Sequence, residues 1–410
     1  MADHADAPID VPESLTRRTR VGVVTGTRAE FGLLRPVMHA VRRHPHLDLR
    51  VIAAGSHLVS PGLTYHEVKR EFPIAAAVPM QVAGRTGRLA DVEALATGIA
   101  RFGRAFDDME LEWVVVLGDR IEAFAAAIAA SVGGRALAHV HAGDRAEGVA
   151  DEAMRHAITK LAHLHLAATP QSAERVVRMG ENPAHVHVVG SPAIDDLASF
   201  PALDDRAYRA LGAPEAVFLM HPIGRDDETE EAAAAEVLGA LDGLRVLALH
   251  PNLDPGREGV LRALRDATPL ELGDDLQPFA DHPEPGVRSV PHLPRATFVG
   301  LLRRLRETGG VLVGNSSAAL IEAAALGVPA VDVGRRQGGR ERAPNVVHAP
   351  HERTAEVRTA LDRARAWGRA HAGTMPTHPY GDGRAGEHIA AAIARTDPHD
   401  DALLRKRCAY

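Results

Sequence analysis

The sequence is almost free of cysteine. Its 410 residues include one, Cys408, close to the C-terminus. A single cysteine excludes a disulfide within the chain and a cysteine-rich zinc site, and it fits a reducing compartment. No apolar run is long enough to span a bilayer, and the polar residues 1–19 contain no apolar core of a secretory signal. We therefore expect a disordered leader over residues 1–19, a cytoplasmic location and no membrane partner.

An excess of positive charge is also missing. The formal net charge is -7, whereas a nucleic-acid-binding protein is expected to carry a basic surface, so we expect no nucleic-acid partner. Hydrophobic residues make up 45% of the chain, which is sufficient for a sizeable core. A chain of this length favours two domains.

Short apolar runs alternate with helical patterns along the whole chain. The runs are continuously apolar, which is typical of parallel strands covered on both faces. In the first half they are Val21–Thr25, Leu49–Ala54, Trp113–Leu117, Ala136–Val140, Leu164–Ala168 and Val186–Val189; in the second half they are Val217–Met220, Leu244–Leu249, Val287–Val290, Val311–Val313 and Ala330–Val333. Helices are expected between them, among them Ala318–Leu326.

This alternation predicts an α/β fold with two Rossmann-like, doubly wound domains. The pattern pauses around Asp195–Pro214. We assign residues 20–200 to the first domain, residues 215–380 to the second, and residues 381–397 to a C-terminal helix that packs back on the first. Ligands of such folds bind at the carboxyl ends of the strands, so the default site is a cleft between the two halves.

Two strand ends of the first half carry arginine beside acidic residues. Thr25–Gly32 contains Arg28 and Glu30, and small residues there open a helix N-terminus to an anion. A tight strand–helix turn explains this string equally well. Gly118 is followed by Asp119 and Arg120. Asp119 is either a helix N-cap or a carboxylate at the floor of the cleft.

A third strand end combines histidines with acids. His139 and His141 are two residues apart and would share a strand face, and Asp144, Asp151, Glu152, Arg155 and His156 follow. A metal site of His139, His141, Asp144 and His156 is one interpretation, but no zinc-binding spacing supports it. The other interpretation is an acid–base cluster of Asp119, Asp144, Asp151 and Glu152, in which crowded carboxylates raise some of the pKa values. For Asp151 and Glu152, a solvated helix N-terminus rich in acids is the alternative. We expect no metal and no cofactor.

The second half supplies further polar groups at strand ends. His221 and the run His250–Asn252 each follow a strand. The string Gly314–Ser317 leads into a helix that contains Glu322, and its hydroxyls suit a phosphate. A helix N-cap would explain one of the two serines, but not the whole string. A Gly- and Arg-rich loop, Gly334–Glu341, contains Arg336 and suits a diphosphate; an exposed basic loop is the alternative.

Together these strings resemble the UDP-N-acetylglucosamine 2-epimerases, and the hydrolysing branch most closely. The resemblance runs in order from Val21 to His388 and rests on TGTRAEFGLLRP, LGDRIEAF, HVHAGD, DEAMRHAITKLAHLH, HPN, VGNSSAALIEAAALGVPAVDVGRRQGGRE and PYGDG. It implies a GT-B-like architecture, a UDP-sugar substrate and a homodimer. It also implies anti elimination of UDP through a 2-acetamidoglucal, then addition at C1 with inversion at C2, giving N-acetylmannosamine and UDP.

The resemblance also implies roles for individual residues. Substrate binding falls on Arg28, Glu30, Arg120, Arg155, His221, Asn252, Ser316, Ser317, Glu322 and Arg336; catalysis falls on Asp119, His141, Asp144, Asp151, Glu152 and His221. The chain departs from the family pattern at Ala142, which replaces a glycine, and at His141, where some members carry Glu. If that position supplies the catalytic acid or base, His141 provides it. A non-hydrolysing epimerase, a GT-B-type glycosyltransferase and a binding protein without activity are the alternatives.

Overall fold

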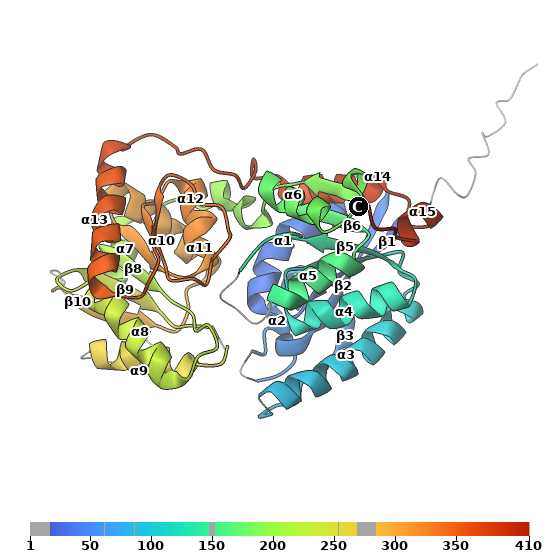
Figure 1. Ribbon diagram of the computed structural model, residues 1–410, viewed down its shortest axis with the longest axis horizontal. Helices are drawn as coiled ribbons and strands as arrows, with labels where there is room; N and C mark the ends of the chain where they lie inside the picture. The colour runs from blue at the N-terminus through green and yellow to red at the C-terminus, as the bar shows by residue number, and fades with distance from the viewer. Residues whose placement is uncertain are drawn as a thin grey trace, which may run out of the picture.

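The computed structural model describes residues 17–60, 62–85, 87–146, 152–252, 254–268 and 284–409. Residues 1–16 of the expected leader lie outside this part. The described chain forms two α/β units that lie side by side, joined by segments that cross between them (Figure 1). No helix of the described part is long and apolar enough to cross a membrane.

The first unit is built around a sheet of seven strands in the order β3-β2-β1-β4-β5-β6-β7, all paired in parallel. Its elements are β1 (Thr19–Thr25), α1 (Arg28–Arg43), β2 (Leu47–Ala54), α2 (Tyr65–Glu71), β3 (Ile74–Val78), α3 (Arg88–Asp108), β4 (Trp113–Leu117), α4 (Ile121–Val132), β5 (Ala136–Val140), α5 (Glu152–Leu161), β6 (Leu164–Ala167), α6 (Pro170–Arg178) and β7 (Val186–Val188).

The second unit repeats this order with six parallel strands, β10-β9-β8-β11-β12-β13. Its elements are α7 (Asp205–Ala210), β8 (Ala216–Leu219), α8 (Asp227–Gly239), β9 (Arg245–Leu249), α9 (Arg257–Ala267), β10 (Gly286–Val290), α10 (Arg295–Thr308), β11 (Val311–Gly314), α11 (Ser317–Leu320), α12 (Glu322–Leu326), β12 (Ala330–Val333), β13 (Val346–Ala349) and α13 (Thr354–Ala370).

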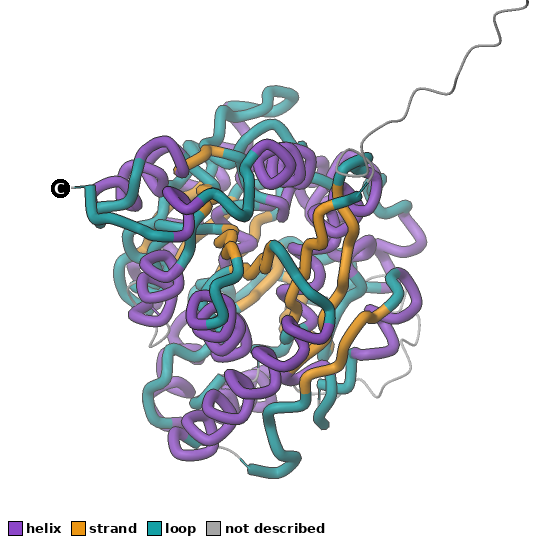
Figure 2. The backbone as a smooth tube through the Cα atoms, turned by 90° about the vertical axis from the view of Figure 1, so that its right-hand side faces the viewer, coloured by secondary structure: helices purple, strands orange, loops and turns teal. Residues whose placement is uncertain are grey.

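Each sheet is covered by helices on both faces, which explains its apolar strands (Figure 2). In β4, Trp113 and Val115 belong to one buried cluster, and Val114 and Val116 belong to another. Successive side chains of a strand point to opposite faces, so every position of β4 is a core position. The prediction of two doubly wound α/β domains is confirmed.

The chain returns to the first unit after α13. Helices α14 (Ala385–Arg395) and α15 (Asp401–Leu404) follow, and Ile389 and Ile393 of α14 join the core cluster that contains α1. A Cβ on Gly386 would lie 2.7 Å from the Pro36 carbonyl oxygen, so only glycine permits this helix approach. The second crossing therefore fixes the end of the chain on the first unit.

Three local predictions were incomplete. The edge strands β3 and β13 did not appear among the expected runs. The helix expected over Ala318–Leu326 is interrupted at Ile321, which has φ -103° and ψ -67° between α11 and α12. The chain therefore changes direction in the middle of that segment.

Candidate active site

The turn after β1 is held by a capping box. Thr27 caps α1 by accepting a hydrogen bond from the Glu30 amide at 3.2 Å, and Glu30 Oε2 accepts from the amides of Gly26 at 2.8 Å and Thr27 at 3.0 Å. Glu30 is 6% exposed and is occupied by its own helix. Arg28 leaves this turn and pairs with Glu67 of α2, its Nε lying 3.0 Å from the carboxylate.

A second buried carboxyl group lies against this turn. Glu122, at the start of α4, is 2% exposed and packs against two glycines. A Cβ on Gly26 would lie 2.6 Å from Glu122 Cβ, and one on Gly55 would lie 2.1 Å from Glu122 Oε1. Burial, and next the nearby Glu122, raise the pKa of Glu30 to about 8. The turn that follows β1 thus contains a carboxyl group, that of Glu30, which keeps its proton near neutral pH.

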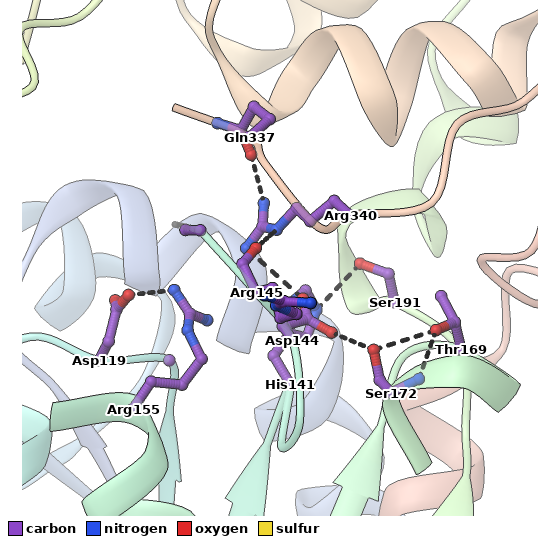
Figure 3. Close-up of polar contacts among 12 residues, drawn as sticks. Asp119, His141, Asp144, Arg145, Arg155, Thr169, Ser172, Ser191, Gln337 and Arg340 are labelled. Carbon is purple, nitrogen blue, oxygen red and sulfur yellow. Dashed lines mark hydrogen bonds and ion pairs between the residues drawn. The ribbon is translucent and has the colours of Figure 1, made fainter. Parts of the chain in front are cut away.

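The end of β4 supplies an aspartate and an arginine that point to different partners. Arg155 of α5, which is 4% exposed, donates to Asp119 (Figure 3). Arg120 donates to Asp254 of the second unit at 2.8 Å. The interpretation of Asp119 as the N-cap was wrong, because the N-cap of α4 is Arg120. Asp119 is therefore free to pair with the buried guanidinium.

His141 and Asp144 form a buried pair just beyond β5. His141 Nδ1 lies 3.1 Å from Asp144 Oδ2, and His141 Nε2 lies 3.1 Å from Ser191 Oγ. His139 instead contacts the Gly118 carbonyl oxygen through Nε2 at 2.8 Å. The two histidines do not share a face as expected, because β5 ends at Val140 and His141 has a left-handed φ of 64°.

Asp144 is surrounded by donors from three parts of the fold (Figure 3). Ser172 donates to Asp144 Oδ1 at 2.9 Å, and Arg340 of the second unit lies 3.5 Å from Oδ2. Burial alone would raise the pKa of Asp144, but His141 and Arg340 outweigh it and hold the pKa well below its usual range. Asp144 is therefore a carboxylate, and His141 Nδ1 carries the proton between them.

The helix α5 brings the remaining expected acid to the same region. Glu152 accepts from the Ala146 amide at 2.7 Å, contacts His156 Nε2 at 3.1 Å, and lies 3.9 Å from Arg155 Nε. Asp151 lies outside the described residues. Across the described ranges, no three His, Cys, Asp or Glu side chains are grouped to hold a metal ion. The described residues of the group predicted from HVHAGD are joined by hydrogen bonds and ion pairs.

In the second unit, His221 is fixed as one tautomer. The Asn252 amide donates to His221 Nδ1 at 3.1 Å, and Asn315 bonds both backbone groups of His221 at 2.7 and 2.8 Å. Burial, and next Arg336, lower the pKa of His221 to about 3. His221 is thus neutral, with its proton on Nε2, where it can donate to a ligand oxygen.

The residues of the second unit that were predicted to bind the substrate differ in their contacts. Ser316 caps α11, accepting from the Ala318 amide at 3.4 Å, while Ser317 begins that helix. Glu322 lies 3.5 Å from Arg295 and is 8% exposed. Arg336 donates to the Asn315 carbonyl at 3.3 Å, and its buried Nε has no hydrogen-bond partner among the described residues. Arg336 therefore still has a donor to offer to a ligand, as do Arg155 through its buried Nε and His221 through Nε2.

The two units meet through ion pairs and hydrogen bonds whose partners come from both units. Asp254 binds Arg120, and Arg340 reaches the Arg145 carbonyl at 2.8 Å as well as Asp144. We use the name inter-domain site for the following residues: Asp119, Arg120, His141, Asp144, Arg155, His221, Asn252, Asp254, Arg336 and Arg340. Ser172, Ser191 and Asp254 follow no recognisable motif, whereas Arg340 belongs to the Gly- and Arg-rich loop.

The inter-domain site combines cations with acid–base groups. Arg336 is within electrostatic reach of Asp254, Arg340, Asp119 and Arg120, so guanidinium groups from both units converge. Converging guanidinium groups suit a diphosphate, and the neutral His221 can donate beside them. On the side of the first unit, Asp119 and the His141–Asp144 pair supply groups that accept or hold protons.

The chain is similar in sequence and in fold to known proteins. The family model described as UDP-N-acetylglucosamine 2-epimerase matches residues 39–394. A UDP-N-acetylglucosamine 2-epimerase of Neisseria meningitidis serogroup B is 32% identical over 85% of this chain and 88% of its own length. A UDP-N,N'-diacetylbacillosamine 2-epimerase (hydrolyzing) of Legionella pneumophila is 31% identical over 94% of this chain and 98% of its own. The crystal structure of UDP-GlcNAc 2-epimerase from Neisseria meningitidis bound to UDP-GlcNAc has the same fold, with a TM-score of 0.73 at 18% identity, covering 92% of this chain and 100% of that one.

Proposed function

Because the chain belongs to the UDP-N-acetylglucosamine 2-epimerase family, we propose that it is a hydrolysing epimerase, which converts UDP-N-acetylglucosamine and water into N-acetylmannosamine and UDP. The observation that carries the hydrolysing assignment is the Legionella relative, which is named as hydrolyzing and matches almost end to end. A homodimer and a cytoplasmic location are part of the same proposal.

The chemistry must avoid direct removal of the C2 proton, because C2 of the sugar is not next to a carbonyl group. In the proposed route a base takes the C2 proton while the C1–O bond breaks, the electron pair of C–H becomes the C1=C2 bond, and UDP leaves with the bonding electrons. Water then adds its oxygen to C1, and a proton is delivered to C2 from the opposite face. The product is the 2-epimer.

The inter-domain site supplies the two requirements of this route. Negative charge grows on the departing diphosphate, and we assign its stabilisation to Arg120 and Arg336 together with the Nε2 proton of His221; the proximity of the two guanidinium groups supports this assignment. We assign the stabilisation of positive charge on the sugar ring, and the transfer of protons to and from it, to Asp119 and to the His141–Asp144 pair. We propose that the second unit holds UDP while the first acts on the sugar. Asp151 and Glu152 remain candidates for the second proton-transfer group.

A single time course tests the assignment. The chain is incubated with UDP-N-acetylglucosamine in deuterium oxide and followed by phosphorus and proton NMR. We expect free UDP to accumulate together with N-acetylmannosamine that carries deuterium at C2. UDP-N-acetylmannosamine without free UDP would identify a non-hydrolysing epimerase, no turnover without an added acceptor would favour a glycosyltransferase, and product without deuterium would refute the elimination route.

The name of the Legionella relative favours a second substrate, UDP-N,N'-diacetylbacillosamine. The same assay with this sugar decides between them through the ratio of the two kcat/KM values. A ratio above about 100 in either direction corresponds to a difference of about 3 kcal/mol in transition-state binding and identifies the preferred sugar.

A further inference from the structure

Ser191 lies where the chain crosses between the two units. It is fully buried on the first crossing segment, which runs from β7 to α7, and its amide donates at 2.8 Å to the carbonyl of Tyr380 on the second crossing segment, which runs from α13 to α14. A Cβ on the adjacent Gly190 would lie 2.9 Å from the same carbonyl oxygen, and one on Gly381 would lie 2.7 Å from Gly190 Cα. The two crossings are therefore in direct backbone contact at this point.

From this position Ser191 reaches His141, which belongs to the first unit. The hydroxyl lies 3.1 Å from His141 Nε2, while Nδ1 is held by the Asp144 carboxylate at 3.1 Å (Figure 3). A hydroxyl can donate to an unprotonated Nε2 or accept from a protonated one. Ser191 can therefore keep its contact in both protonation states of the ring, and with both nitrogens engaged the ring cannot rotate freely.

Asp144, the other member of the His141–Asp144 pair, is contacted by a residue of the second unit. Tyr380 Oη donates to the Glu341 carbonyl at 2.6 Å, and the neighbouring Arg340 lies 3.5 Å from Asp144. Ser191 of the first crossing segment and Arg340 of the Gly- and Arg-rich loop thus contact the His141–Asp144 pair from two sides, and Tyr380 of the second crossing segment contacts both Ser191 and Glu341. Because these contacts join the two units, we expect a rotation of one unit relative to the other to change them.

We propose that Ser191 is a positioning residue that links His141 to the inter-domain crossing, so that the placement of the His141 ring depends on how the two units are arranged. This inference rests on the proposed function in so far as it concerns catalysis. It assigns to Ser191 no contact with the substrate. Its effect is exerted through His141 and couples nucleotide binding by the second unit to the acid–base group of the first.

The first test uses imidazole nitrogen NMR of the full chain labelled with ¹⁵N-histidine, and needs no turnover. The His141 signal is identified by its loss in His141→Gln. Ser191→Ala should shift the Nε2 resonance of His141, whereas Ser199→Ala, a change to an exposed serine of the same crossing segment, should leave it in place. An unchanged His141 resonance in Ser191→Ala overturns the proposal.

The second test adds UDP. In the wild-type chain we expect UDP to shift the His141 signal, and in Ser191→Ala we expect that shift to be lost while UDP still binds, as seen in the phosphorus spectrum. Equal shifts in both chains would show that Ser191 does not transmit the change. Because Ser191 also caps the short helix Pro192–Ile194, Ser191→Thr, which keeps the hydroxyl, serves as the second variant and should retain the wild-type response.

Activity provides the third test. A displaced acid–base group lowers the rate of the chemical step more than it weakens binding, so Ser191→Ala should lower kcat by about 10- to 100-fold and change KM by less than about threefold. A raised KM with an unchanged kcat would overturn the proposal. If the wild-type chain releases no UDP from UDP-N-acetylglucosamine, the proposed function fails, while the NMR comparison without nucleotide still decides whether Ser191 holds His141.

Discussion

Replacing Glu30 with Gln should stabilise the first domain at pH 8 and have little effect near pH 4. The reason is the buried carboxyl group that Glu30 places beside Glu122 at the end of β1. Gln has nearly the same shape, and its side-chain oxygen can still accept from the amides of Gly26 and Thr27. The substitution therefore removes the ionisation and keeps the cap.

The sign follows from the direction of the shift. In the folded chain the pKa of Glu30 is raised from 4.5 to about 8, so between these values the unfolded chain loses a proton that the folded chain keeps. The contribution of Glu30 to stability is fully present below the unfolded pKa and is lost as the pH rises through about 8. The shift sets an upper bound of about 5 kcal/mol, at about 1.4 kcal/mol per pKa unit. Because the two amides favour the charged carboxylate, we expect a gain of about 2–3 kcal/mol for Glu30→Gln at pH 8.

The assay is urea unfolding at pH values from 4 to 8.5, followed by tryptophan fluorescence. The chain has two tryptophans, and Trp113 is fully buried in β4, so in a Trp367→Phe background its emission reports on the first domain. Glu67→Gln, which alters the partly exposed partner of Arg28, is the matched control. If Glu30→Gln and its parent lose stability in parallel between pH 5 and pH 8, the pKa of Glu30 is not raised and the reasoning is wrong.

Two further predictions concern ion pairs. Lys406→Met removes a cation that lies 2.7 Å from the buried Glu181, so the chain should lose about 1–3 kcal/mol of stability at pH 7 in urea unfolding. Arg407→Met, at an exposed position, should change the stability by less than about 0.5 kcal/mol. Equal effects of the two substitutions would refute a role of Lys406 in stabilising the first unit. Asp254→Asn removes the carboxylate that pairs with Arg120, so titration calorimetry should show tighter UDP binding, by about threefold to tenfold. Weaker binding would show that the Arg120–Asp254 pair is itself part of the nucleotide site.

The strands could be predicted from the sequence where they are buried on both faces of the sheet, because such a strand has no polar position. β4 is predicted with its observed bounds because all five residues are buried. β3 was missed because its exposed face leaves Ala75 and Ala77 outside the core, and alanine has little preference for strands. The interruption at Ile321 depends on how α11 and α12 pack, which a pattern of alanines does not record.

Of the candidate site, only the residues that directly follow a strand could be predicted from the sequence. Parallel strands place Asp119 and Asp144 at one edge of the sheet whatever the helices do, so their proximity follows from topology. The partners that define their state could not be predicted in this way. Arg340 follows Asp144 in sequence by 196 residues, and its contact exists only because the two units meet. Ser191 contacts His141 from the segment that leaves the first unit after β7. Glu30 illustrates the opposite case, because a capping box is a local pattern and could have been recognised from Thr27 and Glu30 alone.

The position of His141 is explained by its neighbours and not by the strand before it. A left-handed backbone costs a residue with a side chain about 1–2 kcal/mol, so the conformation at φ 64° must be held by contacts, and Asp144 and Ser191 supply them. A glutamate at this position, as in some family members, would place a second carboxylate beside the ionised Asp144 in a site that is almost closed to water. An imidazole avoids that repulsion, because its Nδ1 proton satisfies Asp144 while Nε2 keeps its contact with Ser191. Histidine at position 141 is therefore the complement of an aspartate that stays charged, and the two residues are best understood as one unit.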